Sequence, residues 1–129
     1  MLRYFAYFLL FGLLGWALDT AYRIFASHER RGNTYLPYFA IVYGIGGVLL
    51  LALYQLTTLN TPAYVFIGTI TITLLELTAG IFCVNILGKR MWDYSASKYN
   101  LYGHIDLQHT IYWVIFAIIM RLIMPQVPF

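Results

Sequence analysis

The ionisable residues of this chain are few, and six of them fall in or beside long apolar segments. Asp19 lies within the first of these segments, and Glu76 lies near the middle of the third. A charge placed inside a bilayer is costly, so an ionisable residue found there is a candidate for binding an ion or moving a proton. The other four gather around the start of the last apolar segment: Asp93, His104, Asp106 and His109.

Helical spacing places these residues on continuous faces, because positions three and four apart lie on one side of a helix. The first segment carries the stripe Gly12, Gly15, Trp16, Asp19, Tyr22 and Arg23. The third carries Thr69, Thr73, Glu76, Gly80 and Cys83, and the fourth carries Asp106, His109, Thr110 and Trp113. A bundle that turns these stripes inward surrounds Glu76 with Asp19, Arg23 and tyrosine side chains.

Each candidate also has a purely structural interpretation. Asp19 and Arg23 are four residues apart and can neutralise each other on one helix face. Glu76 can be a protonated acid that hydrogen-bonds a neighbouring helix, because desolvation raises a carboxyl pKa. Threonines on the third segment can join helices by hydrogen bonds, and we interpret Trp16 and Trp113 as packing residues.

Other kinds of site lack their motifs. His104, Asp106 and His109 lie within six residues, but their spacing is not that of a His-Glu-x-x-His zinc site, so we expect no metal. No Gly-x-Ser-x-Gly elbow is present, and the Gly44–Gly47 stretch lacks the lysine of a phosphate loop. We therefore expect no cofactor, and no nucleotide bound by this chain alone.

The elements that must position these residues follow from composition. Of 129 residues, 61% are hydrophobic and only 10% are charged, which excludes an ordinary soluble domain. Four segments are long and apolar enough to cross a bilayer, at about 2–26, 37–56, 63–87 and 107–124. We predict an all-α integral membrane four-helix bundle, a single domain over 1–129, with an interfacial loop at 88–106.

Ala40, Gly44 and Gly47 form a small-residue face on the second helix that permits close backbone approach.

The basic residues predict an orientation. Six of the eight lie at the first and third joints, and two lie on the side of the termini: Arg23, Arg30, Arg31, Lys89, Arg90 and Lys98, against Arg3 and Arg121. The positive-inside rule then places both joints in the cytoplasm and both termini outside the cell membrane. We therefore interpret the net charge of +3 as a signal for membrane orientation, and we expect no nucleic-acid partner.

Several short motifs together resemble a known family. They are Gly15-Trp16-Ala17-Leu18-Asp19 with Tyr22, Arg31-Gly32, Pro37-Tyr38, Tyr43-Gly44-Ile45-Gly46, Leu75-Glu76 with Gly80, Trp92-Asp93-Tyr94-Ser95, Asn100-Leu101 with Gly103, Ile105 and Leu107, and Pro125. The sequence is similar in these to the ABC-transporter type IV (CmpB-like) family of small bacterial multi-pass proteins. It departs in having Asp19 for the usual Glu, Ala40-Ile41 for Cys-Pro, and Asp106 for Cys or Ser.

The resemblance implies transport, and a chain with no nucleotide site would then need a partner ATPase or self-assembly. We expect a transport or permease-like subunit, with these substrate or ion-binding candidates: Asp19, Arg23, Glu76, Asp93, Tyr94, Asn100, His104 and Asp106. In the third joint, ligand contact competes with a structural hypothesis in which Asp93 and Asn100 cap nearby helix ends.

Two alternatives remain open. The first is an enzyme that acts on a lipid or isoprenoid-like substrate at headgroup level, with Asp93, His104 and Asp106 as acid–base groups. The second is a non-catalytic assembly subunit, forming a homo-oligomer or joining a partner through Ala40, Gly44 and Gly47.

Overall fold

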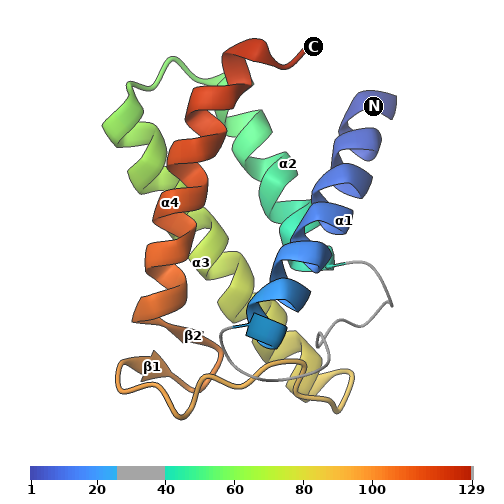
Figure 1. Cartoon of the computed structure of the whole chain (residues 1–129), viewed down its shortest axis with the longest axis vertical. Helices are drawn as coiled ribbons and strands as arrows, with labels where there is room; N and C mark the ends of the chain where they lie inside the picture. Colours follow the sequence, from blue (N-terminus) through green and yellow to red (C-terminus); the bar gives the residue numbers. More distant parts are fainter. Residues whose placement is uncertain (26–39, 129) are drawn as a thin grey trace. The chain divides into compact units, whose positions relative to one another are not determined.

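The computed structural model describes residues 1–25 and 40–128, and within them the chain is mostly helical (Figure 1). The helices are α1 (Leu2–Phe25), α2 (Ile41–Leu56), α3 (Thr61–Asn85) and α4 (Leu107–Ile123), the last continued by a 3-10 turn, η1 (Met124–Gln126). Two short strands, β1 (Asn100–Leu101) and β2 (Ile105–Asp106), precede α4. The predicted first joint with Arg30 and Arg31, and the predicted start of the second helix at Pro37, lie outside the described residues.

Three helical segments are long and apolar enough to span a membrane: α1, α3, and α4 together with η1. The described part of α2 is a shorter apolar helix of 16 residues. Large apolar side chains such as Leu13, Phe66 and Ile115 are about half exposed or more, which suits contact with lipid rather than water. The predicted membrane protein with apolar spanning helices is confirmed, while the closed four-helix bundle remains a prediction.

The described residues form two compact units, Met1–Val48 and Leu49–Phe129, whose boundary falls inside α2. In the first unit, α1 and the start of α2 approach closely at glycines. A Cβ on Gly44 would lie 2.8 Å from the Phe8 ring and 2.9 Å from the Phe8 carbonyl oxygen, and one on Gly47 would meet Phe11. The predicted small-residue face thus permits close packing, and its partner is α1 of the same chain.

The core of the second unit lies between α3, α4 and the end of α2. Its fully buried side chains include Leu50, Tyr64, Ile72, Ala117 and Met120. The Tyr64 hydroxyl donates a hydrogen bond of 3.0 Å to the Leu50 carbonyl, which ties the start of α3 to α2. Glu76 follows Ile72 by four residues, so it lies on the face of α3 that this core buries.

The ends of α3 differ slightly from the predicted range of 63–87. The Asn60 side chain accepts a hydrogen bond of 3.0 Å from the Ala63 N–H, and Pro62 occupies the first turn. Both are helix-start signals, so α3 begins at Thr61, two residues earlier than hydropathy predicts. At the other end α3 closes at Asn85, two residues before the predicted end.

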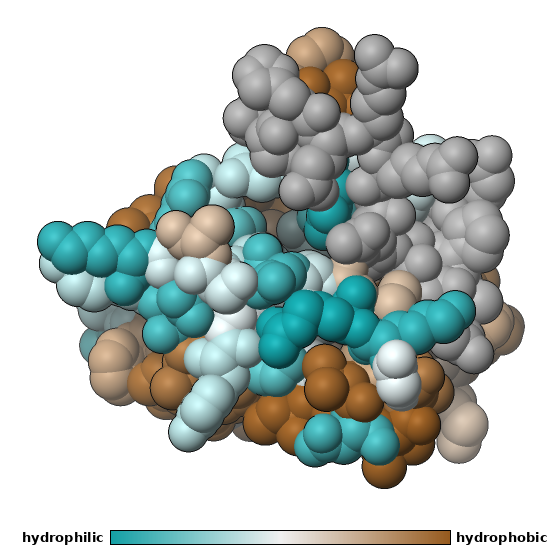
Figure 2. Space-filling view, turned by 90° about the horizontal axis from the view of Figure 1, so that it is seen from below, coloured by the Kyte–Doolittle hydropathy of each residue, from teal (hydrophilic) through white to brown (hydrophobic). Residues whose placement is uncertain are grey.

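The segment between α3 and α4, residues 86–106, is compact rather than extended. β1 and β2 pair antiparallel, with Asn100 opposite Asp106 and Leu101 opposite Ile105. Tyr102 and Gly103 make the reversal at positive φ, 54° and 70°. Its exposed residues include Lys89, Arg90, Asp93 and Lys98, and Figure 2 shows hydrophilic residues gathered over this end, bordered by hydrophobic ones.

Candidate functional site

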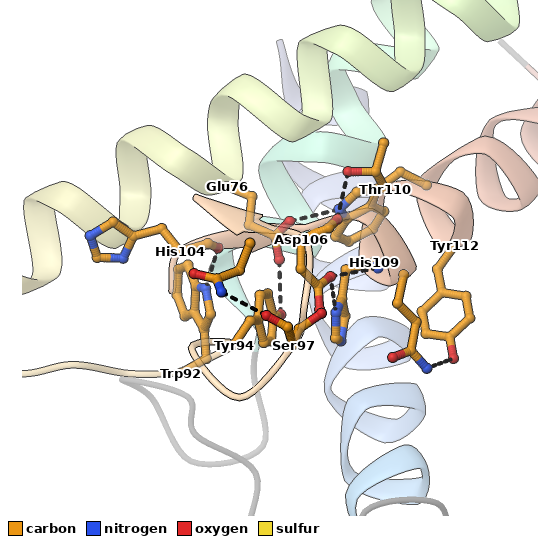
Figure 3. A network of polar contacts seen from close by, with 12 residues as sticks. Glu76, Trp92, Tyr94, Ser97, His104, Asp106, His109, Thr110 and Tyr112 are labelled. Carbon is orange, nitrogen blue, oxygen red and sulfur yellow. Dashed lines mark hydrogen bonds and ion pairs between the residues drawn. The ribbon is translucent and has the colours of Figure 1, made fainter. Parts of the chain in front are cut away.

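Glu76, a carboxylic acid within a membrane-spanning helix, is 4% exposed and lies at the centre of a polar network (Figure 3). Its Oε1 accepts a hydrogen bond of 3.0 Å from the Tyr94 hydroxyl. Its Oε2 accepts one of 2.9 Å from the Trp113 indole N–H. The three residues come from three elements, namely α3, the 86–106 segment and α4.

The loop residue Tyr94 reaches deep into the helical part of this unit. Glu76 lies nine residues before the end of α3, which is roughly 14 Å along the helix axis. The hydrogen bond from Tyr94 therefore requires the 86–106 segment to fold back along α3. The loop does not merely connect two helices, because it supplies part of the surroundings of the buried carboxyl group.

The two donors on Glu76 differ in chemistry. An indole nitrogen can only donate, so Oε2 must act as an acceptor whichever proton state Glu76 adopts. A phenol can donate or accept, so the Tyr94 bond persists with reversed direction when Oε1 carries a proton. This arrangement tolerates both the ionised and the protonated acid without leaving either of these two partners unsatisfied.

A second layer connects Tyr94 to the beginning of α4. The Tyr94 and His109 rings stack with centroids 3.8 Å apart and planes 9° from parallel. His109 Nδ1 lies 2.6 Å from Asp106 Oδ1. The same oxygen accepts the His109 backbone N–H at 2.7 Å, which makes Asp106 the N-cap of α4. His109, Asp106 and Tyr94 therefore form one connected group beside Glu76.

His104 is held against α3 at a glycine. A Cβ on Gly80 would lie 2.6 Å from His104 Nδ1, so the bare backbone of Gly80 makes room for the ring. The Trp92 indole donates a hydrogen bond of 2.8 Å to the His104 carbonyl. Burial lowers the pKa of His104 below its ordinary value of 6.5, and the Arg90 cation adds to this effect. The ring is therefore neutral at pH 7.

Asp93 and Asn100 stabilise turns within the segment. Asp93 accepts the Ser95 N–H at 2.9 Å, while the Asn100 side chain accepts the Gly103 N–H at 2.9 Å and donates to the Ser97 carbonyl at 2.7 Å. The hydrogen bonds from Ser95 lower the pKa of Asp93, and Arg90 contributes to this. The prediction that these two residues cap helix ends is wrong. The cap of α4 is Asp106, because it directly precedes the helix.

Asp19 and Arg23 lie in the other compact unit. Arg23 Nε donates to Asp19 Oδ2 at 2.9 Å, an i, i+4 pair in which Arg23 is 9% exposed. The pair neutralises two charges inside α1, as its spacing predicts. The predicted convergence of Asp19 and Arg23 on Glu76 remains a prediction.

Four threonines in the middle of α3 divide into two groups. The Thr71 and Thr78 hydroxyls donate to carbonyls of their own helix. The Thr69 and Thr73 hydroxyl oxygens are buried and have no hydrogen-bond partner within the described part of the chain. Thr69 and Thr73 share the helix face of Glu76, so buried hydrogen-bonding capacity extends along α3 from the carboxyl group.

Two residues contribute more than their sequence positions indicated. We interpreted Trp113 as a packing residue, yet its N–H contacts Glu76 directly. His109 was absent from the predicted binding residues, although its helical stripe with Asp106 and Trp113 was the available signal. Within residues 1–25 and 40–128, no three His, Cys, Asp or Glu side chains are grouped as metal ligands.

Comparison with known proteins identifies the family. No curated protein and no solved structure matches the chain. A family model described as Putative ABC-transporter type IV matches residues 6–128, which is nearly the whole chain and includes every residue of the Glu76 network. The chain therefore belongs to the Putative ABC-transporter type IV family.

Proposed function

We propose that this protein is the membrane subunit of a transport system for an ion or small molecule, and that Glu76 is its proton- or cation-binding position. The observation that carries the proposal is the arrangement of a donor-only indole and a reversible phenol on the two oxygens of one buried carboxyl group. A group that serves structure alone needs one proton state. This group keeps both partners in either state, as a site that gains and loses a proton must.

The unpartnered threonines support a polar route to this position. Buried polar groups are normally satisfied, so Thr69 and Thr73 are exceptions that require an explanation. Each lies on the face of α3 that carries Glu76, one and two turns toward the helix start. Water or a permeating ion in contact with these hydroxyls would satisfy them and would connect Glu76 with the α2–α3 end of the unit.

The 86–106 segment, at the other end of this unit, offers a surface through which a partner ATPase could act on Glu76. Tyr94 belongs to the 86–106 segment, whose exposed surface carries Lys89, Arg90 and Lys98. The positive-inside rule places this segment in the cytoplasm, where an ATPase partner would bind. Force applied to the segment would act on Glu76 through the Tyr94 hydroxyl. We infer that transport requires such a partner or self-assembly.

The two alternatives receive less support from the geometry. An enzyme at headgroup level would need Asp93 and Asp106 as acid–base groups, but both carboxylates accept backbone N–H bonds that hold turns and caps. An assembly subunit would need the Ala40, Gly44 and Gly47 face, but Gly44 and Gly47 pack against α1. A partner interface would have to lie elsewhere.

Infrared difference spectroscopy tests the site directly. The purified protein in detergent is titrated with acid, and the carbonyl band of a protonated carboxylic acid is followed. We expect one component of this band to be lost in Glu76→Gln and to shift in frequency in Tyr94→Phe. Asp93→Asn is the matched control, since it removes an exposed acid of the segment and should leave that component in place.

Proton and cation uptake into proteoliposomes is the functional measurement. If the wild-type chain conducts, Glu76→Gln should abolish the flux and Asp93→Asn should preserve it. A band and a flux that are both unchanged in Glu76→Gln would remove Glu76 from the mechanism.

A further inference from the structure

A cavity of about 590 Å³ lies in the second unit, at the end opposite the 86–106 segment. Its lining residues come from the end of α2, the α2–α3 turn, the start of α3 and the end of α4: Tyr54, Gln55, Thr57, Thr58, Leu59, Tyr64 and Arg121. Figure 1 shows the α2–α3 turn and the end of α4 at the same end. Tyr64 lies twelve residues before Glu76, roughly 18 Å along α3, so this cavity is separate from the Glu76 site.

The charge of the cavity comes from a single residue. Arg121 is cationic at any physiological pH, and the lining contains no aspartate or glutamate. In the described part of the chain no carboxylate forms an ion pair with Arg121. A positive charge with no carboxylate partner among the described residues favours an anion as the ligand.

The guanidinium group is positioned by contacts with two aromatic rings. Its central carbon lies 4.9 Å from the centre of the Tyr54 ring and 5.8 Å from that of Tyr64. Tyr64 is itself fixed, because it is 1% exposed and its hydroxyl is bonded to Leu50. Arg121 Nε is buried and has no hydrogen-bond partner among residues 1–25 and 40–128. These cation–π contacts hold the guanidinium group in place and leave its Nε without a partner among the described residues.

The depth of Arg121 identifies the level at which a ligand would lie. Gln126, the last residue of η1, lies five positions after Arg121, which corresponds to roughly 8 Å of helix. The turn residues Thr57, Thr58 and Leu59 flank it on the same side. This is the depth of lipid headgroups rather than of the bilayer centre. Phosphate is the anion found at that depth, and its oxygens match the two parallel N–H bonds of an arginine.

We propose that this cavity binds a phosphate group, held by paired hydrogen bonds from Arg121. The phosphate belongs either to an anionic phospholipid or to a soluble phosphate compound. Thr58 is an exposed residue of the turn that also lines the cavity, and its hydroxyl is an additional hydrogen-bond donor. The site is independent of Glu76 and adds to the proposed transport function a recognition step for phosphate at the opposite end.

Native mass spectrometry of the full chain in a neutral detergent tests the proposal. The probes are phosphatidylglycerol, a galactosyl diacylglycerol that lacks phosphate, and inorganic phosphate as a competitor. The wild type should retain phosphatidylglycerol in preference to the glycolipid. Arg121→Gln should weaken retention about 10- to 100-fold, and Arg121→Lys less, because lysine keeps the charge but loses the fork. Arg3→Gln, at the other basic residue predicted on this side, is the matched control and should bind as the wild type does.

The competitor distinguishes the two sources of phosphate. If millimolar inorganic phosphate displaces the lipid, the ligand is a soluble phosphate compound; if it does not, the ligand is the phospholipid. Equal retention of the two lipids together with no binding of inorganic phosphate would overturn the proposal, and so would unchanged binding of lipid and phosphate in Arg121→Gln. Circular dichroism melting establishes that each variant is folded before its binding is compared.

Discussion

Removing one hydroxyl group tests the network around Glu76. Tyr94→Phe deletes the donor that lies 3.0 Å from Glu76 Oε1. The phenylalanine ring can keep the 3.8 Å stack on His109, so the change isolates the hydrogen bond. We expect the variant to fold and to be less stable than the wild type, because one oxygen of a buried carboxyl group loses a partner.

The size of the effect follows from the charge of the acceptor. A hydrogen bond to an ionised group contributes about 1.5–3 kcal/mol, while hydrogen bonds measured inside membrane proteins reach about 1.7 kcal/mol. We therefore expect Tyr94→Phe to lower the free energy of unfolding by about 1–2 kcal/mol. In a Glu76→Gln background the amide oxygen must accept from the Trp113 indole, so the neutral amide N–H donates to the Tyr94 hydroxyl, and the same change should cost only about 0.5 kcal/mol. The coupling energy between the two residues is then about 1 kcal/mol.

Reversible unfolding in mixed detergent micelles measures the four proteins of this double-mutant cycle. Tyr112→Phe is the matched control, since it removes a hydroxyl that accepts a hydrogen bond from Gln108 on the exposed side of α4. That variant should change stability by less than about 0.5 kcal/mol. A coupling energy near zero, or equal losses in the Tyr94 and Tyr112 variants, would refute the assigned contact between Tyr94 and Glu76.

Three further predictions concern residues that support the site. Gly80→Ala places a methyl group 2.6 Å from His104 Nδ1. The overpacking should lower the free energy of unfolding by about 1–3 kcal/mol in the same assay, and an unchanged unfolding curve would contradict this. Asp106→Ala removes the N-cap of α4 and should lower the free energy of unfolding by about 0.5–2 kcal/mol. Asp106→Asn keeps a capping oxygen and should lower it less. Equal losses of stability in the two variants would show that the cap is not the cause. The pKa of His104 is lowered from 6.5 in the folded protein, so the unfolded chain binds more protons than the folded protein as pH falls through 6.5. The contribution of His104 to the free energy of unfolding is therefore full above that pH and declines below it. Melting temperatures between pH 7.5 and 5.5 should show this decline, and His104→Gln should reduce it.

The helices were predictable because a membrane leaves the chain few options. Backbone groups without water must bond within the segment, so long apolar runs become helices whatever their detailed sequence. The predicted range 107–124 differs from α4 by one residue. The start of α3 lies two residues before the predicted start, because a hydropathy pattern marks apolar runs and takes no account of the helix-start signals at Asn60 and Pro62.

The site was predictable only in part. Helical spacing placed Glu76 on one stripe and Asp106, His109 and Trp113 on another, since membership of a stripe depends on local geometry alone. The reach of Tyr94 to Glu76 was not predictable, because it depends on how a segment of 21 residues folds back, and short-range spacing carries no information about that path. The cavity at Arg121 was missed for a similar reason, as its rings come from two other helices.

The pairing of β1 with β2 places the residue that begins α4. Asn100 lies opposite Asp106, and Asp106 is also the N-cap of the helix. Each residue of an α-helix advances the side-chain direction by about 100°, so one residue inserted into the first turn of α4 would turn every later side chain away from its partner. Trp113 would then leave Glu76, and Arg121 would leave the two tyrosines. We therefore expect a single codon gained or lost just after Asp106 to disrupt both the Glu76 network and the Arg121 cavity, whereas the turn between the strands can absorb an extra residue.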